Sequence, residues 1–224
     1  MHGNLYVIAT PIGNLGDITA RALDALRTAS LVLSEDTRQA KKMLERFGIN
    51  TPLARLDAHA DRRAIDSAIA RLRNGETLAL VTDAGTPAIS DPGSWLVSEA
   101  IRELGDVLKV IPIPGPSSVT AALSVSGFPA DSFVFFGFIP PKKGRAARIA
   151  EIAECGRTAV FFESPYRIEK TLTELNAACP KRQTVICREL TKLHETIYRG
   201  TLEELAKPGI IRPQGEFVVV LKNV

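Results

Sequence analysis

Apolar runs and amphipathic stretches alternate along the first half of the chain. Four short segments are continuous apolar runs, a pattern typical of strands that are buried on both faces. These segments are residues 5–10, 30–34, 77–82 and 107–113. The stretches between them place apolar residues at helical spacing, and 61–75 does so most clearly, with Asp61 as a candidate N-cap. This alternation predicts a parallel sheet that is covered by helices on both faces.

The same alternation resumes after the Pro- and Gly-rich stretch PIPGPSS at 112–118. The predicted elements are helices at 118–127, 144–156 and 167–179 and strands at 132–138, 158–164, 183–189, 195–200 and 216–224. The last two strands have no full helix between them, which indicates a mixed sheet. The sequence therefore predicts an α/β protein of two domains, 1–114 and 115–224.

Long or unusual loops follow the predicted strands at their carboxyl ends. The loop at 82–93, TDAGTPAISDPG, has twelve residues, whereas a strand-to-helix loop usually has about two to six. In an open parallel sheet, ligands bind at the carboxyl ends of the strands. The six loops of this kind contain TPIGNLGD, EDTR, TDAGTPAISDPG, PIPGPSS, ESPYR and RELTKLHE. Together they predict one cleft between the two domains.

Each loop taken singly also has a structural explanation. Asp17 or Thr19 is a candidate helix cap, and the DPG at 91–93 is a common turn and helix start. No GxGxxG opens a helix and no GxxxxGK[ST] occurs, which disfavours a Rossmann dinucleotide enzyme and a P-loop NTPase. Small residues let the backbone approach a ligand closely. The loops therefore favour a ligand held largely by backbone groups, with a purine among Pro, Gly, Ala and Ser.

Composition narrows the class of protein. The 224 residues are 45% hydrophobic and 24% charged, as in ordinary globular proteins, and no apolar run is long enough to span a bilayer. The N-terminus lacks the features of a signal peptide. The three cysteines show no CxxC spacing, so we expect reduced thiols in a cytoplasmic protein. His2, His59 and His194 are scattered, so no metal site is predicted. A net charge of +3 permits a polyanionic partner without requiring one.

Seven ordered motifs carry a resemblance to a known family. They are ATPIGNLGDIT, EDTR, TDAGTPAISDPG, PIPGPSSVTAALSVSG, FFGFIP, FFESPYR and RELTKLHE. From about residue 4 to residue 222 the chain resembles the tetrapyrrole methylase-like superfamily, and within it the bacterial enzymes that methylate small-subunit (16S) ribosomal RNA. The resemblance implies a homodimer with S-adenosylmethionine in the cleft between two α/β domains. It also implies methyl transfer to the ribose 2′-oxygen of a cytidine, in the RNA or in the assembled 30S subunit.

The resemblance further implies a set of cofactor contacts. These are Pro11, Ile12, Asp83, Gly85, Thr86, Ser117, Ser118, Phe162, Leu190 and Gly215. On this basis the long 82–93 loop wraps the cofactor, and the carboxylate of Asp83 accepts ligand hydrogen bonds or faces the sulfonium charge. Members of the family commonly carry a further small helical C-terminal region. We expect this region to be absent here, because the sequence stops at Val224 just after a strand.

Methyl transfer from a sulfonium requires the nucleophilic oxygen to lie close to the methyl group and opposite the sulfur. A ribose hydroxyl is a weak acid, so a general base or a cation that favours the alkoxide would help. The predicted catalytic residues are Glu35, Arg38, Glu163, Arg167 and Lys192, and Asp36, Arg188 and Glu189 lie in the same loops. The alternative explanation for these charges is a set of salt bridges between the domains. His194 is a further possible base, but a histidine of this kind is more often a polar surface residue.

Clustered Lys and Arg residues predict where RNA binds. The stretch PPKKGRAAR follows FFGFIP and supplies the predicted RNA contacts Lys142, Lys143, Arg145 and Arg148, and RQAKK at 38–42 is a second cluster. The alternative is a solvated helix face.

Three hypotheses for function therefore remain open from the sequence. The first is the ribose methyltransferase. The second is a methyltransferase of the same fold that acts on a tetrapyrrole precursor. The third is a non-catalytic module that binds RNA or a nucleotide. A transfer assay with labelled S-adenosylmethionine, small subunits and naked RNA separates them.

Overall fold

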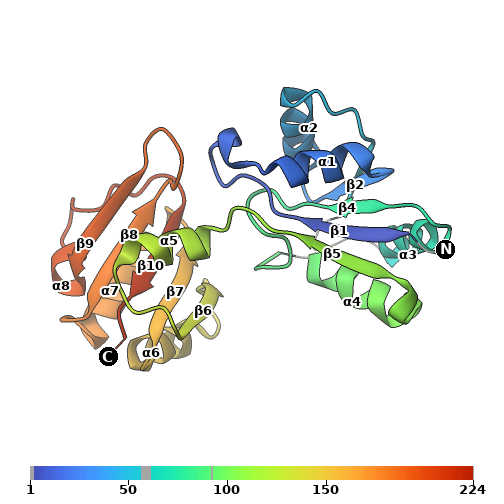
Figure 1. The fold of residues 1–224 in the computed structure, drawn as a ribbon. Helices are drawn as coiled ribbons and strands as arrows, with labels where there is room; N and C mark the ends of the chain where they lie inside the picture. The colour runs from blue at the N-terminus through green and yellow to red at the C-terminus, as the bar shows by residue number, and fades with distance from the viewer. Residues whose placement is uncertain (1–2, 57–61, 92, 224) are drawn as a thin grey trace. The chain divides into compact units, whose positions relative to one another are not determined.

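The computed structural model describes residues 3–56, 62–91 and 93–223. They form two compact units, Met1–Ser117 and Ser118–Val224, which are shown in Figure 1. The division between the units lies three residues beyond the predicted boundary at 114/115, at the end of the PIPGPSS stretch. The histidines His2 and His59, the predicted cap Asp61 and Pro92 of the DPG turn lie outside the described residues.

The first unit is built on a parallel sheet. Its strands are β1 (Asn4–Ile8), β2 (Leu31–Ser34), β3 (Leu53–Arg55), β4 (Leu78–Leu80) and β5 (Lys109–Ile113). They lie in the order β3-β2-β4-β1-β5, and every neighbouring pair is parallel, which confirms the predicted parallel sheet. The three residues of β3 were not predicted, because none of them is buried and they form no apolar run.

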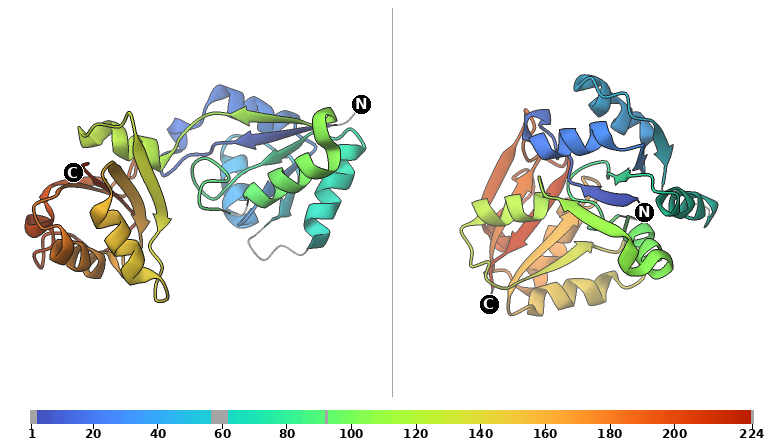
Figure 2. Two further views of the ribbon diagram at one scale, coloured as in Figure 1. Left: turned by 90° about the horizontal axis from the view of Figure 1, so that it is seen from below. Right: turned by 45° about the vertical axis from the view of Figure 1, so that its right-hand side comes forward.

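Helices cover both faces of this sheet. They are α1 (Ala20–Thr28), α2 (Thr37–Arg46), α3 (Arg62–Arg73) and α4 (Gly93–Leu104), with short 3-10 turns at η1 (Leu15–Asp17) and η2 (Gly105–Val107). One core joins β-strand leucines such as Leu78 to Ile65 of α3 and Leu96 of α4. A second core joins Val32 and other strand residues to Leu26 of α1 and to α2. Figures 1 and 2 show the two helix pairs on opposite sides of the sheet.

The second unit is built on a mixed sheet, as the sequence predicts. Its strands are β6 (Phe133–Phe138), β7 (Thr158–Glu163), β8 (Gln183–Arg188), β9 (Thr196–Thr201) and β10 (Phe217–Leu221). They lie in the order β6-β7-β10-β8-β9. The pair β6 and β7 is parallel, whereas β10 is antiparallel to both β7 and β8, and β8 is antiparallel to β9.

The main core of the second unit lies on one face of its sheet. The helices of this unit are α5 (Ser118–Ser126), α6 (Arg145–Glu154), α7 (Ile168–Ala178) and the short α8 (Leu202–Leu205). Helices α6, α7 and α8 pack against Phe161 of β7 and Val219 of β10. Helix α5 contacts β7 and β10, and Figure 1 shows it on the opposite face from α7. Side chains alternate between the two faces along each strand, so Phe162 faces away from the core that contains Phe161.

Strand direction places the loops of each unit at one edge of its sheet. In the first unit the carboxyl ends of β1, β2, β4 and β5 share an edge, which we call the first loop edge. In the second unit β6, β7 and β8 run in one direction and β10 runs in the other. The carboxyl ends of these three strands and the amino end of β10 therefore share the second loop edge.

Within the described ranges, none of the helices combines the length and the apolar character that a membrane crossing requires. The same ranges contain no group of three or more His, Cys, Asp or Glu side chains that could hold a metal ion.

Candidate functional site

Hydrogen bonds join the four loops of the first loop edge to one another. Thr10, after β1, and Gly85, after β4, exchange two backbone hydrogen bonds of 2.9 and 3.1 Å. The hydroxyl of Thr86 donates to the carbonyl of Pro116, after β5, at 3.1 Å. The backbone N–H of Asp36, after β2, donates to Oδ1 of Asp83 at 3.1 Å. The loop at 82–93 therefore contacts each of the other three loops and fixes their positions.

Close packing explains why two glycines stand at this edge. Gly85 has a φ of +85°, and a Cβ there would lie 3.3 Å from the Ile12 side chain. A Cβ at Gly115 would lie 3.1 Å from the Cβ of Ala9. The backbones of the loops after β1, β4 and β5 therefore approach more closely than side chains would allow.

The loop at 82–93 also holds strained backbone. Ala88 and Ser90 have φ values of +69° and +64°, a region that residues with a side chain rarely occupy. The carboxylate of Asp91 accepts a hydrogen bond from Gly93 N at 2.7 Å, and its other oxygen is buried without a hydrogen-bond partner. Such strain persists where surrounding structure enforces it, and it clusters at ligand-binding sites.

The EDTR motif places its charges at the same edge. Asp36 is the N-cap of α2, and its carboxylate accepts hydrogen bonds from both the backbone and the side chain of Arg38. The Arg38 guanidinium lowers the pKa of Asp36 to about 2. Arg38 itself is almost fully exposed, and Glu35 is half-buried. The predicted catalytic residues Glu35 and Arg38 thus flank a carboxylate that stays ionised at neutral pH.

The structure places six predicted cofactor residues on the loops of the first loop edge. They are Pro11, Ile12, Asp83, Gly85, Thr86 and Ser117. Pro11, Ile12 and Gly85 are buried and form the base of the loop cluster, whereas Asp83 is exposed. The exposed carboxylate and the buried apolar and backbone groups therefore belong to the same cluster of loops.

At the second loop edge, aromatic rings surround Phe162. Its ring centroid lies 4.9 Å from that of Phe135 and 5.2 Å from that of Phe138. Phe138, at the end of β6, remains 56% exposed. The predicted cofactor residue Phe162 thus belongs to an apolar surface at the end of β6 and β7.

Glu189 joins the loop after β8 to the loop before β10. We call the group of Glu189, Lys192 and Glu216 the lock. The Glu189 carboxylate accepts hydrogen bonds from Glu216 N and from Lys192 Nζ, both at 2.9 Å, and Lys192 also pairs with Glu216 at 3.0 Å. Burial raises the pKa of Glu189, but these hydrogen bonds outweigh burial and lower it overall. Burial likewise opposes the charge of Lys192, and its two carboxylate partners raise its pKa. Lys192 is therefore held as a fixed cation.

The positions of Leu190 and Gly215 depend on this lock. Glu189 and Thr191, on either side of Leu190, have φ values of +53° and +65°. Gly215 has a φ of +91°, and a Cβ there would lie only 2.5–2.6 Å from the side-chain atoms of Glu189. The glycine is required because the carboxylate of Glu189 fills the space that a side chain would occupy.

Two predicted functional residues, Glu163 and Arg145, lie buried in the second unit. Glu163 is 1% exposed and Arg145 is 6% exposed. The Glu163 carboxylate accepts hydrogen bonds from Ser164 N and Thr171 Oγ1 at 2.7 Å and pairs with Arg167 at 2.9 Å. Arg145 donates to Thr171 Oγ1 at 2.8 Å and lies 3.7 Å from Glu163. These side chains are engaged inside the protein, which favours structural roles, and the catalytic role of Glu163 and the RNA-binding role of Arg145 stay predictions.

The other charged candidates divide between structural and exposed positions. Arg188 is buried and donates to the carbonyls of Gln214 and His194, so it connects two loops. Lys142 and Lys143 are exposed in the turn before α6. Arg148, on α6, lies 5.5 Å from the ring of Phe136 and pairs with Glu151. The exposed cations of the PPKKGRAAR stretch are therefore mainly Lys142 and Lys143.

Comparison with known proteins decides the family. The family model described as Tetrapyrrole (Corrin/Porphyrin) Methylases matches residues 4–206. The chain belongs to this family. Among solved structures of the fold, diphthine synthase matches with a TM-score of 0.75 at 20% identity, over 98% of this chain and 90% of that one. Uroporphyrin-III-C-methyltransferase from Thermus thermophilus matches with a TM-score of 0.66 at 19% identity, over 98% and 94%. These two likenesses confirm the predicted fold class.

Curated relatives from bacteria are much more similar in sequence. A protein of Xylella fastidiosa named Ribosomal RNA small subunit methyltransferase I is 45% identical over 99% of this chain and 82% of its own length. A relative of the same name from Vibrio cholerae is 47% identical over 90% of this chain and 69% of its own length. Another, from Thermotoga maritima, is 41% identical over 99% of this chain and 99% of its own length. The family and these names support a methyltransferase.

Two residues that organise the loop edges lie outside the predicted site set. Thr10 is buried, and its hydroxyl donates to the carbonyl of Thr82 at 3.2 Å, in addition to the backbone pair with Gly85. Glu216 completes the lock of Glu189 and Lys192. Thr10 lies within the ATPIGNLGDIT motif, and Glu216 follows the predicted contact Gly215. In the sequence, the signal that could have identified Thr10 and Glu216 as functional is their position within a motif or beside a predicted contact.

Proposed function

We propose that the chain transfers a methyl group from S-adenosylmethionine to the ribose 2′-oxygen of a cytidine in small-subunit ribosomal RNA. The observation that carries this proposal is the set of relatives named Ribosomal RNA small subunit methyltransferase I, at 41–47% identity over at least 90% of the chain. The tetrapyrrole alternative has weaker support, because the uroporphyrin enzyme is only 19% identical. The proposal assigns functional residues to the loops of both the first and the second loop edge.

The residues present fit S-adenosylmethionine. Gly85 and Gly115 bring backbone groups close together without side chains between them, which suits a ligand that is bound through backbone N–H and C=O groups. Asp83 is exposed, and Asp36 N fixes only one of its two carboxylate oxygens. That arrangement suits a polar or cationic part of the ligand, and the rings around Phe162 suit an apolar part. When bound, S-adenosylmethionine supplies an electrophilic methyl group on a sulfonium.

The remaining charged candidates have distinct roles in this proposal. Lys192, as a fixed cation at the second loop edge, stabilises negative charge that develops on the attacking ribose oxygen. Glu35 and Arg38 lie at the first loop edge, where Glu35 is the candidate base and Arg38 an exposed phosphate partner. Arg167 is a positioning residue, because its guanidinium is held by Glu163, Ser164 and Ile139. Lys142 and Lys143 bind RNA phosphates.

The direct test is a transfer assay with S-adenosylmethionine that carries a labelled methyl group. We expect label in small subunits or in their RNA, and digestion of that RNA should yield a 2′-O-methylated cytidine. Label in a tetrapyrrole substrate but not in RNA would replace this proposal with the tetrapyrrole reaction. Cofactor binding without transfer to either substrate would favour a non-catalytic module.

We predict that Asp83→Ala weakens binding of S-adenosylmethionine by roughly 1.5–3 kcal/mol, the typical contribution of a hydrogen bond to a charged group. Titration calorimetry on the folded variant measures the change. Asp106→Ala is the matched control, since Asp106 is an exposed carboxylate of η2 that precedes β5 and therefore lies at the opposite edge of the same sheet. Unchanged affinity in the Asp83 variant would remove this residue from the site.

We also predict a homodimer, as the family resemblance implies. Light scattering should give about twice the mass of the 24.2 kDa chain. A single-chain mass at high protein concentration would contradict the dimer and leave the methyltransferase proposal unaffected.

A further inference from the structure

The side chains of Arg145, Glu163 and Arg167, of which the first two are buried and the third is partly buried, fix two turns of the second unit to each other. The first turn, 140–144, connects β6 to α6 and carries Lys142 and Lys143. The second turn, 164–167, connects β7 to α7 and carries Tyr166. We call them the lysine turn and the tyrosine turn. Their sequences are separated by a whole helix and strand, but both begin at the second loop edge.

Specific contacts connect the two turns. The Arg167 guanidinium donates to the carbonyl of Ile139 at 3.0 Å, directly before the lysine turn. Within the tyrosine turn, Arg167 N donates to the carbonyl of Ser164 at 3.1 Å, and Arg167 Nε donates to Ser164 Oγ at 3.1 Å. Glu163 pairs with Arg167 at 2.9 Å and shares Thr171 with Arg145, the first residue of α6. The turns therefore keep a fixed spacing.

The side chain at the tip of the tyrosine turn is almost completely exposed. Tyr166 is 96% exposed, although the residue that follows it is held by three polar partners. A large ring on a rigid turn loses little conformational entropy when it binds a flat partner. The turn thus presents the ring for binding and does not bury it within its own unit.

The lysine turn, which Arg167 joins to the tyrosine turn, carries positive charge. Lys142 and Lys143 are exposed, and within the described ranges no ion pair connects either of them to a carboxylate. Lys142 is three residues from Ile139, so the backbone between them spans at most about 11 Å. An exposed ring on one turn and two cations on the turn joined to it match the two parts of a nucleotide, a flat base and a phosphate.

We propose that Tyr166 stacks on an unpaired base of the RNA substrate while Lys142 and Lys143 bind the neighbouring phosphates. This inference rests on the proposed function, and it adds a base-contacting residue that sets which RNA conformation is accepted. Proteins recognise RNA sequence mainly in single-stranded loops, where unstacked bases stack on aromatic side chains. A base inside a duplex offers no free face to Tyr166. The surface should therefore select an unpaired or extruded nucleotide.

The test measures binding of a fluorescent single-stranded RNA oligonucleotide and of the same strand in a duplex, over a range of salt concentrations. One stacked base contributes roughly 1–3 kcal/mol, so Tyr166→Ala should weaken single-strand binding by about 5-fold to 150-fold. The duplex should bind the variant as it binds the wild type. Tyr166→Phe should retain the single-strand affinity, because the ring and not the hydroxyl provides the stacking.

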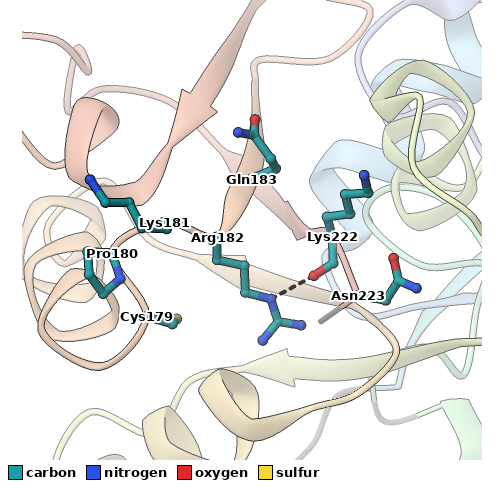
Figure 3. Close-up of a pocket in the computed structure, with 7 residues that line it drawn as sticks. All are labelled: Cys179, Pro180, Lys181, Arg182, Gln183, Lys222 and Asn223. Carbon is teal, nitrogen blue, oxygen red and sulfur yellow. Dashed lines mark hydrogen bonds between the residues drawn. The ribbon is translucent and has the colours of Figure 1, made fainter.

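The lysines should give a different signature. Each phosphate contact with a single strand contributes about 0.7 to the slope of log affinity against log salt, so Lys142→Ala with Lys143→Ala should lower that slope by about 1.4. Tyr166→Ala should leave the slope unchanged. The controls lie at the opposite edge of the same sheet: Phe133→Ala at the start of β6, and Lys181→Ala with Lys222→Ala, two lysines that line the pocket in Figure 3.

Several outcomes would overturn the inference. Wild-type affinity in Tyr166→Ala, or an equal loss in Tyr166→Phe, would show that the ring does not stack on a base. A change in mass of Tyr166→Ala by light scattering would show that the ring contacts a second copy of the chain. Methyl transfer by the wild type is measured in parallel. Transfer with normal RNA binding by Tyr166→Ala refutes only the stacking, whereas loss of binding without any transfer by the wild type refutes only the proposed function.

Discussion

Gly215→Ala should strongly lower the affinity for S-adenosylmethionine and should destabilise the second unit. Two costs add at this position. A residue with a side chain in the left-handed region costs about 1–2 kcal/mol, and Gly215 has a φ of +91°. The new Cβ would also overlap Glu189, which would have to give up hydrogen bonds from Glu216 N and Lys192. Each hydrogen bond to a charged group is worth about 1.5–3 kcal/mol. The combined expected cost is roughly 4–8 kcal/mol.

Gly209→Ala is a control that separates the two costs. Gly209 has a similar φ of +81°, but a Cβ there would meet nothing within 4 Å. It should therefore lose only the conformational part, about 1–2 kcal/mol, with little change in cofactor affinity. Denaturant unfolding gives the stability of each variant, and calorimetry with S-adenosylmethionine gives the affinity.

A double variant tests the mechanism of the Gly215 effect. Glu189→Ala removes the side-chain atoms that the new Cβ would overlap. Residues in contact couple energetically, so Glu189→Ala with Gly215→Ala should cost clearly less than the sum of the two single variants. Additive costs would mean that Glu189 does not occupy the space over Gly215, and that the lock does not position Leu190 and Gly215.

The regular elements were predictable because their signals are local. The apolar runs that became β1, β2, β4 and β5 differ from the amphipathic stretches between them, and strand-helix alternation implies a parallel sheet. The loop at 82–93 was recognisable from its length and small residues alone. Its place at the carboxyl end of β4 followed from the order of the elements. The resemblance then supplied the identity of the family, which the family model confirms.

The charged residues were harder to assign because their environment depends on distant contacts. Arg145 and Arg148 stand in one basic stretch, and nothing in the sequence separates them. The structure buries Arg145, at the start of α6, against α7, whereas Arg148 is partly exposed. Similarly, Gly215 is explained by Glu189, a residue 26 positions earlier in the chain. Such pairs become visible only when β8 and β10 are placed side by side.

Arg145→Ala should destabilise the second unit by roughly 3–5 kcal/mol, the cost of removing one partner from a buried ion pair. The change removes the 2.8 Å hydrogen bond to Thr171 and the 2.7 Å pair with Glu174. It also removes the cation nearest to one oxygen of the buried Glu163 carboxylate. Arg148→Ala, on the same helix, is the matched control and should cost about 1 kcal/mol or less, because its ion pair with Glu151 is exposed to solvent.

The two units offer separate probes for this measurement. The single tryptophan, Trp95, lies on α4 of the first unit, so its fluorescence follows unfolding of that unit. Amide hydrogen exchange in α6 and α7 follows the second unit. Faster exchange in both helices of Arg145→Ala, at urea concentrations where Trp95 fluorescence is unchanged, would place the loss in the second unit. A loss below about 1 kcal/mol would show that the ion pair adds little to stability, in which case its main role would be to hold the lysine turn and the tyrosine turn together.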